Sequence, residues 1–205
     1  MGETVKIAVT PPVQAGGSLF TPAQLALIGS LAADGARIEM TPFRQLYMEV
    51  EAERRQAISE ELERSGLEVY GAGFVVKGLI ACNFCKGAEE AGLETAKRLN
   101  RAIAGIEAPM PLKVGYAGCA LGTSEPLLKG IGIVKMRDVF DIYVGGEPKG
   151  IKAATAKLLV SGLPEDRLIP AVTAIIAYYK AHAKGKEKFG KFVDRVSLDT
   201  LRQLA

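Results

Sequence analysis

The sequence predicts an α+β protein built from two unequal parts, and two observations carry this prediction. Residues 5–70 alternate between short apolar strands and helical stretches in the order β-α-β-β-α-β. Beyond the small residues at 71–73, glycines become frequent and cysteines appear among further strands and helices. We therefore expect a first unit over residues 1–72 and a second over residues 73–205 that share an interface.

The first helix of the N-terminal unit has clear start signals. The strand at residues 5–12 ends in two prolines, which cannot continue a hydrogen-bonded ladder. Thr21 is expected to cap the following helix, Pro22 to occupy its first turn and Gly35 to end it. Apolar residues recur every three positions and predict the buried face of this helix: Leu25, Ile28 and Leu31.

The rest of this unit completes a known order of elements. Two short strands are expected on either side of Pro42, and residues 51–66 read as a second helix closed by Gly66. A last strand lies at residues 67–71. Together these elements give the ferredoxin-like split βαβ pattern, so the first unit is expected to be a ferredoxin-like half-domain.

The second unit alternates helices with strands in an α/β pattern. The predicted elements are a helix at 87–105, a strand at 111–118, a strand pair at 125–135 and 139–146, the longest helix at 164–185 and a final helix at 192–205. The helix at 87–105 has an apolar face with the helical spacing. That face consists of Leu93, Ala96, Leu99 and Ile103.

Composition excludes several classes of protein. The 205 residues are 48% hydrophobic and 24% charged, with a net charge of +3, which is ordinary for a globular domain. No basic stripe with interleaved aromatic residues indicates nucleic-acid binding, and no apolar run is long enough to cross a membrane. The N-terminus lacks the apolar core of a secretory signal. We expect a cytoplasmic protein whose thiols are reduced.

Three cysteines form the most informative cluster. Cys82 and Cys85 follow one apolar strand, and Cys119 follows another, each where the chain opens into a glycine-containing turn. Such turns let thiolates approach a compact iron-sulfur cluster. The same residues could instead be small core side chains, or a zinc site completed by His182, the single histidine.

The residues around the cysteines resemble the nitrite and sulfite reductase family. The segments "AGCALGTSEPLLKGIGIV" and "FDIYVGG" follow "CKGAEEAGLETAKRLNRAI" in the family's order. The resemblance extends from "TPFRQ", which is similar to a family strand of the T-x-R-Q type, to the C-terminal tail. The length is similar to that of the short, single-repeat members.

This resemblance implies a redox site. Family members hold a [4Fe-4S] cluster coupled to a sirohaem, receive electrons from a donor protein and reduce a small oxyanion. Cys82, Cys85 and Cys119 match cluster ligands, whereas Thr123 stands where the family has its fourth cysteine. Only two residues separate Cys82 from Cys85, fewer than the family usually has. A hydroxyl is a poor iron ligand, so a labile cluster and weak or no sulfite reduction are expected.

The resemblance also implies cationic residues that bind an anion. Arg44 matches the arginine of the T-x-R-Q strand and Gln45 its glutamine, so a role against the cofactor is implied for both. Lys77 falls where the family has an arginine, and Lys113 matches the second of two lysines, the first being replaced by Pro111. Arg44, Lys77 and Lys113 are thus the implied catalytic cations, with Thr123 and Lys129 as further cofactor contacts.

Three interpretations follow. The leading one is an oligomeric iron-sulfur oxidoreductase of the nitrite/sulfite reductase type, in which an electron donor protein and a small oxyanion meet at a tetrapyrrole. The second is a non-catalytic protein that binds or carries sirohaem or a related tetrapyrrole. The third is a zinc protein whose metal is held by the three cysteines and His182.

Overall fold

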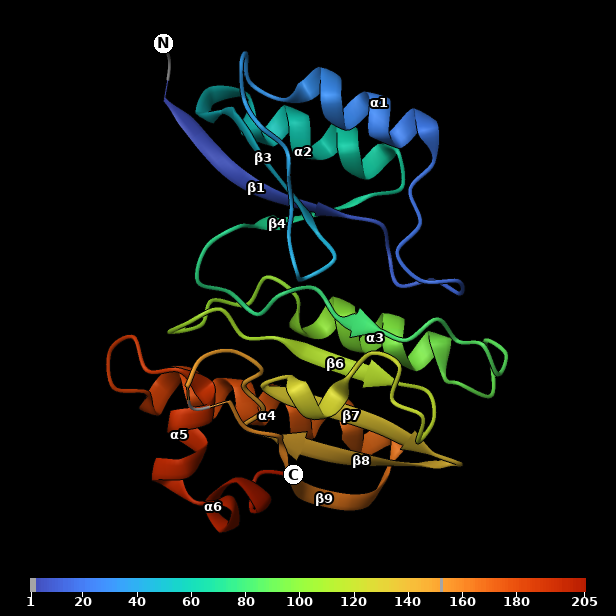
Figure 1. Cartoon of the computed structure of the whole chain (residues 1–205), viewed down its shortest axis with the longest axis vertical. Coiled ribbons are helices and arrows are strands. Elements are labelled where there is room, and N and C mark those ends of the chain that lie inside the picture. Colours follow the sequence, from blue (N-terminus) through green and yellow to red (C-terminus); the bar gives the residue numbers. More distant parts are fainter. Residues whose placement is uncertain (1–2, 152) are drawn as a thin grey trace.

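The computed structural model describes residues 3–151 and 153–205 of the chain. Two layered units follow one another (Figure 1). The N-terminal unit contains β1 (Thr4–Thr10), α1 (Pro22–Leu31), β2 (Glu39–Met40), β3 (Leu46–Glu51), the 3-10 turn η1 (Ala52–Arg54), α2 (Arg55–Arg64) and β4 (Glu68–Gly71). Its four strands form an antiparallel sheet in the order β2-β3-β1-β4. Both helices lie on the same side of this sheet (Figure 1).

The C-terminal unit is built on a mixed sheet. Its elements are β5 (Ile80–Ala81), α3 (Leu93–Ile103), β6 (Val114–Ala117), η2 (Pro126–Leu128), β7 (Ile131–Met136), β8 (Val139–Val144), β9 (Lys157–Pro164), α4 (Glu165–His182), α5 (Phe189–Val196) and α6 (Leu198–Arg202). The strand order is β5-β6-β7-β8-β9. The β5-β6 and β6-β7 pairs are parallel, and the β7-β8 and β8-β9 pairs are antiparallel.

Each unit has its own hydrophobic core. Side chains from the N-terminal sheet, among them Ile7 and Met48, pack against Ile28 of α1 and Leu62 of α2. A larger, separate cluster joins the C-terminal sheet to its helices. The fold is therefore α+β, with the predicted order of elements in the N-terminal unit. Among the residues described, no helix combines the length and apolar character that crossing a membrane requires.

Several predicted details are wrong. Thr21 does cap α1 in a capping box with Gln24, but the helix ends at Leu31, before Gly35. Leu25 is 49% exposed because the face of α1 that packs on the sheet is formed by Leu27, Ile28 and Leu31, and Leu25 lies beside this face. The final predicted helix is two helices, since Ser197 has φ of 72° and interrupts the α-helical path.

Strand β9 was not predicted at all. Its segment KLLVSGLP shows no clean alternation of apolar and polar residues, and only two of its positions are buried. It pairs with β8 at the edge of the sheet, and the register shifts around Ile142. An irregular edge strand of this kind carries little sequence signal.

A buried polar network ties the two units together. Asn100 of α3 donates from Nδ2 to the Glu68 carboxylate of β4 (2.8 Å) and accepts at Oδ1 from the Leu79 N–H (2.8 Å). The same Glu68 oxygen accepts the Tyr70 hydroxyl (2.8 Å). Burial and the Glu68 carboxylate raise the pKa of Tyr70, so its hydroxyl remains a donor. Asn100 itself is 2% exposed, so water cannot replace these bonds.

Replacing Asn100 with alanine should therefore lower the free energy of unfolding by about 1–3 kcal/mol, because buried partners lose their hydrogen bonds. Urea unfolding followed by circular dichroism measures this change. Arg101→Ala, at an exposed position on the same helix, is the matched control and should change stability by less than about 0.5 kcal/mol. Equal effects of the two substitutions would show that the network does not hold the units together.

Candidate functional site

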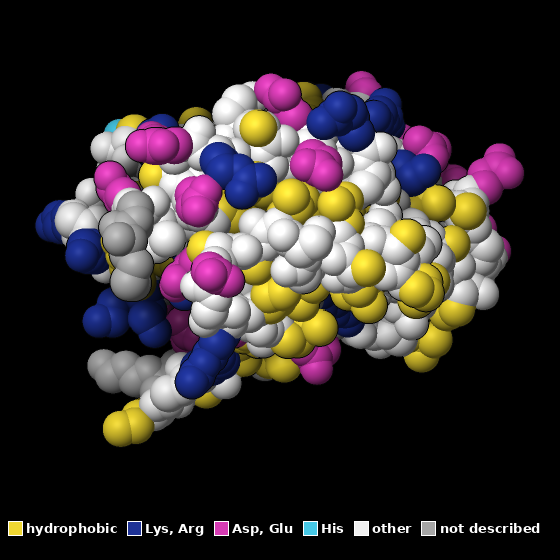
Figure 2. Space-filling model, turned by 90° about the horizontal axis from the view of Figure 1, so that it is seen from above, with side chains coloured by type: hydrophobic (Ala, Val, Ile, Leu, Met, Phe, Trp, Pro, Cys, Tyr) yellow, Lys and Arg dark blue, Asp and Glu magenta, His cyan; other side chains and the backbone are white. Residues whose placement is uncertain are grey.

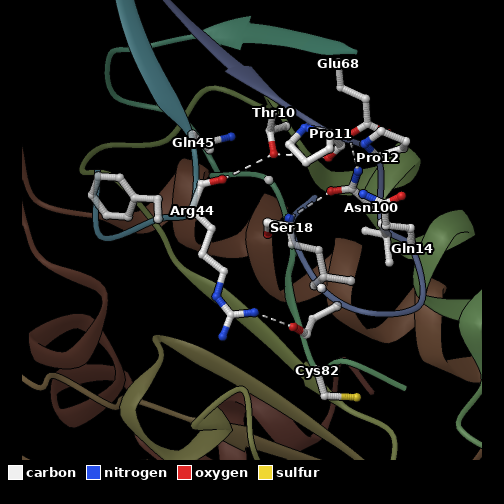
Figure 3. Close-up of a pocket in the computed structure, with 16 residues that line it drawn as sticks. Thr10, Pro11, Pro12, Gln14, Ser18, Arg44, Gln45, Glu68, Cys82 and Asn100 are labelled. Carbon is white, nitrogen blue, oxygen red and sulfur yellow. Dashed lines mark hydrogen bonds between the residues drawn. The ribbon is translucent and has the colours of Figure 1, made fainter. Parts of the chain in front are cut away.

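A polar pocket lies where the two units meet (Figure 3). The N-terminal unit contributes the segment that follows β1 and the turn between β2 and β3. The C-terminal unit contributes the start and end of β5 and the middle of α3. Its polar lining residues include Thr10, Gln14, Ser18, Arg44, Gln45, Glu68, Cys82 and Asn100. The pocket thus combines a thiol, a guanidinium, a carboxylate and several amides.

Arg44 crosses from one unit to the other. Its Nη1 donates to the Ala81 carbonyl at the end of β5 (2.8 Å), which brings the guanidinium beside Cys82 (Figure 3). The residue has φ of 60°, a conformation that costs energy for a side chain other than glycine. The turn is stabilised by Thr41, whose hydroxyl donates to the Gln45 carbonyl (2.8 Å). One of five guanidinium N–H groups is used in the Ala81 bond, so others remain to bind an anion.

Gln45 carries the clearest sign of a missing partner. Its side chain is 2% exposed, and neither Oε1 nor Nε2 has a hydrogen-bond partner. An unpaired buried amide costs about 1–3 kcal/mol. Gly78 lies against it, since a Cβ there would come within 2.9 Å of Nε2. Gln45 is among the residues that line the interunit pocket.

The thiol of Cys82 is held at the junction of two parallel strands. The backbone N–H of Cys82 donates to the Tyr116 carbonyl (2.9 Å), and the Cys82 Sγ accepts a hydrogen bond from the Gly118 N–H (3.2 Å). Position 118 requires glycine, because a Cβ would come within 2.5 Å of Ala91 Cβ. Parallel pairing of β5 with β6 therefore places the peptide next to Cys119 against the Cys82 thiol.

The other two thiols point elsewhere. Phe84 is buried and stacks on Tyr116 (6.1 Å between ring centroids). Its φ of 55° turns the chain, and the next residue, Cys85, is exposed. Cys119 is partly exposed and lines a different hollow, formed with Lys86 and residues 135–138. Within residues 3–151 and 153–205, no three His, Cys, Asp or Glu side chains are close enough to hold a metal ion.

These residues fit an iron-sulfur group in donor type, because all three are free thiols. Three thiols follow adjacent strand ends, two of them in a strained, glycine-flanked loop. Binding of all three to one group would require the Cys85 and Cys119 side chains to turn toward the Cys82 thiol. The chain does not fit a group with four thiolates, because Thr123 is exposed and is not a thiol.

Lys77 lies outside the interunit pocket. It is 2% exposed and donates to the carbonyls of Ala72 (3.1 Å) and Gly73 (2.8 Å), and burial lowers its pKa to about 8. Its ammonium also lies over the rings of Phe43 (5.6 Å) and Tyr47 (5.4 Å). These contacts support the turn that carries Arg44.

Lys113 and Lys129 are also separate from this pocket. Lys113 lies over the same Phe43 ring, with its Nζ 5.1 Å from the ring centroid, and lines a second pocket. Lys129 pairs with Glu125 (3.1 Å) and is 8% exposed. The structure therefore brings Arg44, Gln45 and Cys82 together, but not Lys77, Lys113, Lys129 or Thr123.

His182 is remote from the thiols. It lies at the last residue of α4, where its Nδ1 is 3.0 Å from the Tyr178 carbonyl and its ring stacks on Tyr178 (4.0 Å). Glu165, at the first residue of that helix, contacts Thr95 near the start of α3. About 26 Å of helix lies between Glu165 and His182. The structure does not assemble the zinc set of three cysteines and His182.

Sequence reasoning missed several lining residues. Glu68 and Asn100 lie in the middle of a predicted strand and helix, and nothing in the local pattern marks them. Phe43 and the pair Pro11 and Pro12 carried a signal, since a proline pair ending a strand redirects the chain. Their contribution to a pocket becomes visible only once the units are packed together.

Comparisons with known proteins agree with this fold. The chain is 28% identical over 193 residues to a cobalt-factor III methyltransferase of Priestia megaterium, covering 93% of this chain and 35% of that protein. It is 26% identical over 212 residues to the nitrite reductase [NAD(P)H] large subunit of Klebsiella oxytoca, covering 96% of this chain and 21% of that protein. The chain thus spans about a third or less of these relatives.

Two solved structures share the fold. The Mycobacterium tuberculosis NirA protein superposes with a TM-score of 0.62 at 20% identity, over 97% of this chain and 39% of that one. Dissimilatory sulfite reductase I superposes with a TM-score of 0.73 at 12% identity, over 98% of this chain and 68% of that one. Residues 76–205 match the family described as the nitrite and sulphite reductase 4Fe-4S domain. With most of its length in that match, the chain belongs to the nitrite and sulphite reductase 4Fe-4S domain family.

Proposed function

We propose that this chain is an iron-sulfur redox domain that binds a tetrapyrrole or a small oxyanion where its two units meet. The observation that carries the proposal is the buried, unpartnered Gln45 amide beside Arg44 and Cys82. A pocket in which a cation, an amide and a thiol converge is a typical ligand site. Family membership supports an iron-sulfur group as its redox partner.

In this proposal each residue has a distinct part. Cys82, Cys85 and Cys119 hold an iron-sulfur group, which supplies one-electron transfer when bound. Arg44 neutralises an anionic group of the ligand, and the Gln45 amide fixes its orientation by hydrogen bonding. Lys77 keeps the turn between β2 and β3 in place through Phe43 and Tyr47. The electrons come from a donor protein, and the substrate that they reduce is a small oxyanion such as sulfite or nitrite.

A second candidate function is a carrier or modifier of tetrapyrroles without oxyanion reduction. The match to a cobalt-factor III methyltransferase, at 28% identity over 93% of this chain, favours it. So does Thr123, because the chain lacks a thiol at that position. An assay of sirohaem-loaded protein with reduced viologen as electron donor and sulfite or nitrite as substrate distinguishes a reductase from a carrier. Turnover supports a reductase, whereas stable binding without turnover supports a carrier.

The anaerobically purified protein should contain iron and acid-labile sulfide, and Cys119→Ser should remove most of both, because the remaining two thiolates cannot hold the group. Thr123→Cys should increase the iron retained after gel filtration, since a thiolate replaces a hydroxyl. Ser30→Cys, which adds a thiol on exposed α1, is the control and should change nothing. Stoichiometric zinc without sulfide would refute the assignment.

Gln45→Leu should stabilise the ligand-free protein by about 1–2 kcal/mol, because it removes an unpaired buried amide at similar volume. The same substitution should weaken sirohaem binding roughly tenfold, the loss expected for one hydrogen bond in a buried site. Thermal unfolding with and without sirohaem measures both effects. The exposed Gln56→Leu serves as the control. A destabilised variant that binds sirohaem normally would show that Gln45 does not face a ligand.

A further inference from the structure

The segment that joins β1 to α1 reaches from the N-terminal unit to a thiol of the C-terminal unit. Residues 12–18 of this segment, which we call the strap, form no helix or strand. Val13 of the strap is 9% exposed and belongs to the hydrophobic cluster of the C-terminal unit, together with Cys82 and Phe84. The strap and Cys82 also line the same pocket (Figure 3). A side chain of the first unit thus helps to bury a thiol of the second.

The space beside this thiol is too small for the group that the thiols are proposed to hold. The interunit pocket has a volume of about 30 Å³, which is room for one or two water molecules. Cys82 itself is 7% exposed. A cluster of several iron and sulfur atoms can therefore reach this thiol only after a wall of the pocket has moved. The wall that is held least firmly is expected to move.

The other walls of the pocket are fixed by hydrogen bonds. Arg44 binds the turn between β2 and β3 to the Ala81 carbonyl of the C-terminal unit (2.8 Å). Asn100 of α3 is bound to Glu68 (2.8 Å) and to the Leu79 N–H (2.8 Å). Strand β1 is paired on both sides, with β3 and with β4. Moving any of these walls would break hydrogen bonds in buried surroundings.

The strap is held by fewer contacts. Among the described residues, its one backbone hydrogen bond to the C-terminal unit runs from the Gly16 N–H to the Asn83 carbonyl (3.0 Å). Residues 11–20 include no charged side chain, so no ion pair supports them. The centre and right of Figure 2 likewise show mainly hydrophobic and uncharged side chains. Gly16 and Gly17 have φ of 90° and 97°, which gives the strap a pivot of two glycines next to Val13.

We propose that the strap opens to expose Cys82 to an incoming metal group and closes over the thiol afterwards. Opening withdraws Val13 from the C-terminal core and breaks the bond between Gly16 and Asn83, while the rest of each core stays packed. Such local opening costs far less than unfolding a whole unit. The identity of the incoming group as an iron-sulfur group rests on the proposed function, whereas the movement of the strap does not.

The test is the rate at which N-ethylmaleimide alkylates Cys82 in the full chain, freed of iron with a chelator and kept reduced. Tandem mass spectrometry gives the rate at each cysteine. Cys85 is exposed, so it should react first in every variant and serves as the internal reference. In the unaltered protein Cys82 should react at least about tenfold more slowly than Cys85, because it is accessible only while the strap is open.

Two substitutions should open the strap, and each has a matched control. Val13→Ala shortens the apolar anchor and Gly17→Ala strains the pivot, so each should speed the alkylation of Cys82 about tenfold. Val160→Ala trims a partly buried valine that packs on the same core from β9, at the opposite edge of the sheet. Gly35→Ala creates similar backbone strain (φ of 71°) with no other atom within 4 Å. Neither control should change the rate.

Acceleration by both strap variants and by neither control supports the proposal. It is overturned if Val13→Ala or Gly17→Ala leaves Cys82 reacting at the rate of the unaltered protein, because the strap would then not limit access to the thiol. It is also overturned if a control speeds the reaction as much, since the effect would then be general loosening. Uptake of iron and sulfide by the same variants tests the proposed function separately. No uptake by any of them would refute the iron-sulfur assignment, while the alkylation rates still decide whether the strap opens.

Discussion

The parallel pairing of β5 with β6 is the constraint on which the site depends. It places the chain ends that follow the two strands side by side, so the Gly118 N–H meets the Cys82 thiol (3.2 Å). The same register places the starts of the strands together, which positions Lys77 and Lys113 beneath Phe43. Lys77 and Lys113 are therefore separated from Cys82 and Cys119 by the length of the strands.

Strained backbone occurs in the turn that carries Arg44, in the loop between Cys82 and Cys85 and in the loop that follows Cys119. Arg44, Phe84 and Glu125 all have positive φ, near 50–60°. Each is fixed by its surroundings: Arg44 by its bond to Ala81, Phe84 by stacking on Tyr116 and Glu125 by its ion pair with Lys129. Backbone held in costly conformations at a site is consistent with preorganisation for a ligand. The price in stability is offset by the well-packed core of each unit.

The N-terminal fold could be predicted from the sequence because each element has local signals. Thr21 caps α1 through its side chain, and the prolines after β1 end that strand. The site was only partly predictable. Local motifs pointed to the cysteines and to Arg44 and Gln45, whereas Glu68 and Asn100 join the pocket through packing of distant segments. Lys113 was expected to face the same ligand as Arg44, but Arg44 lines the interunit pocket and Lys113 lines a second pocket.

We propose that the three thiols serve an iron-sulfur group next to a tetrapyrrole site. The ultraviolet-visible spectrum of anaerobically purified protein, recorded before and after addition of sirohaem and then dithionite, tests it most directly. We expect a broad brown absorption that dithionite bleaches, and sharp added bands that stay with the protein through gel filtration. A colourless protein that neither bleaches nor retains sirohaem would contradict it.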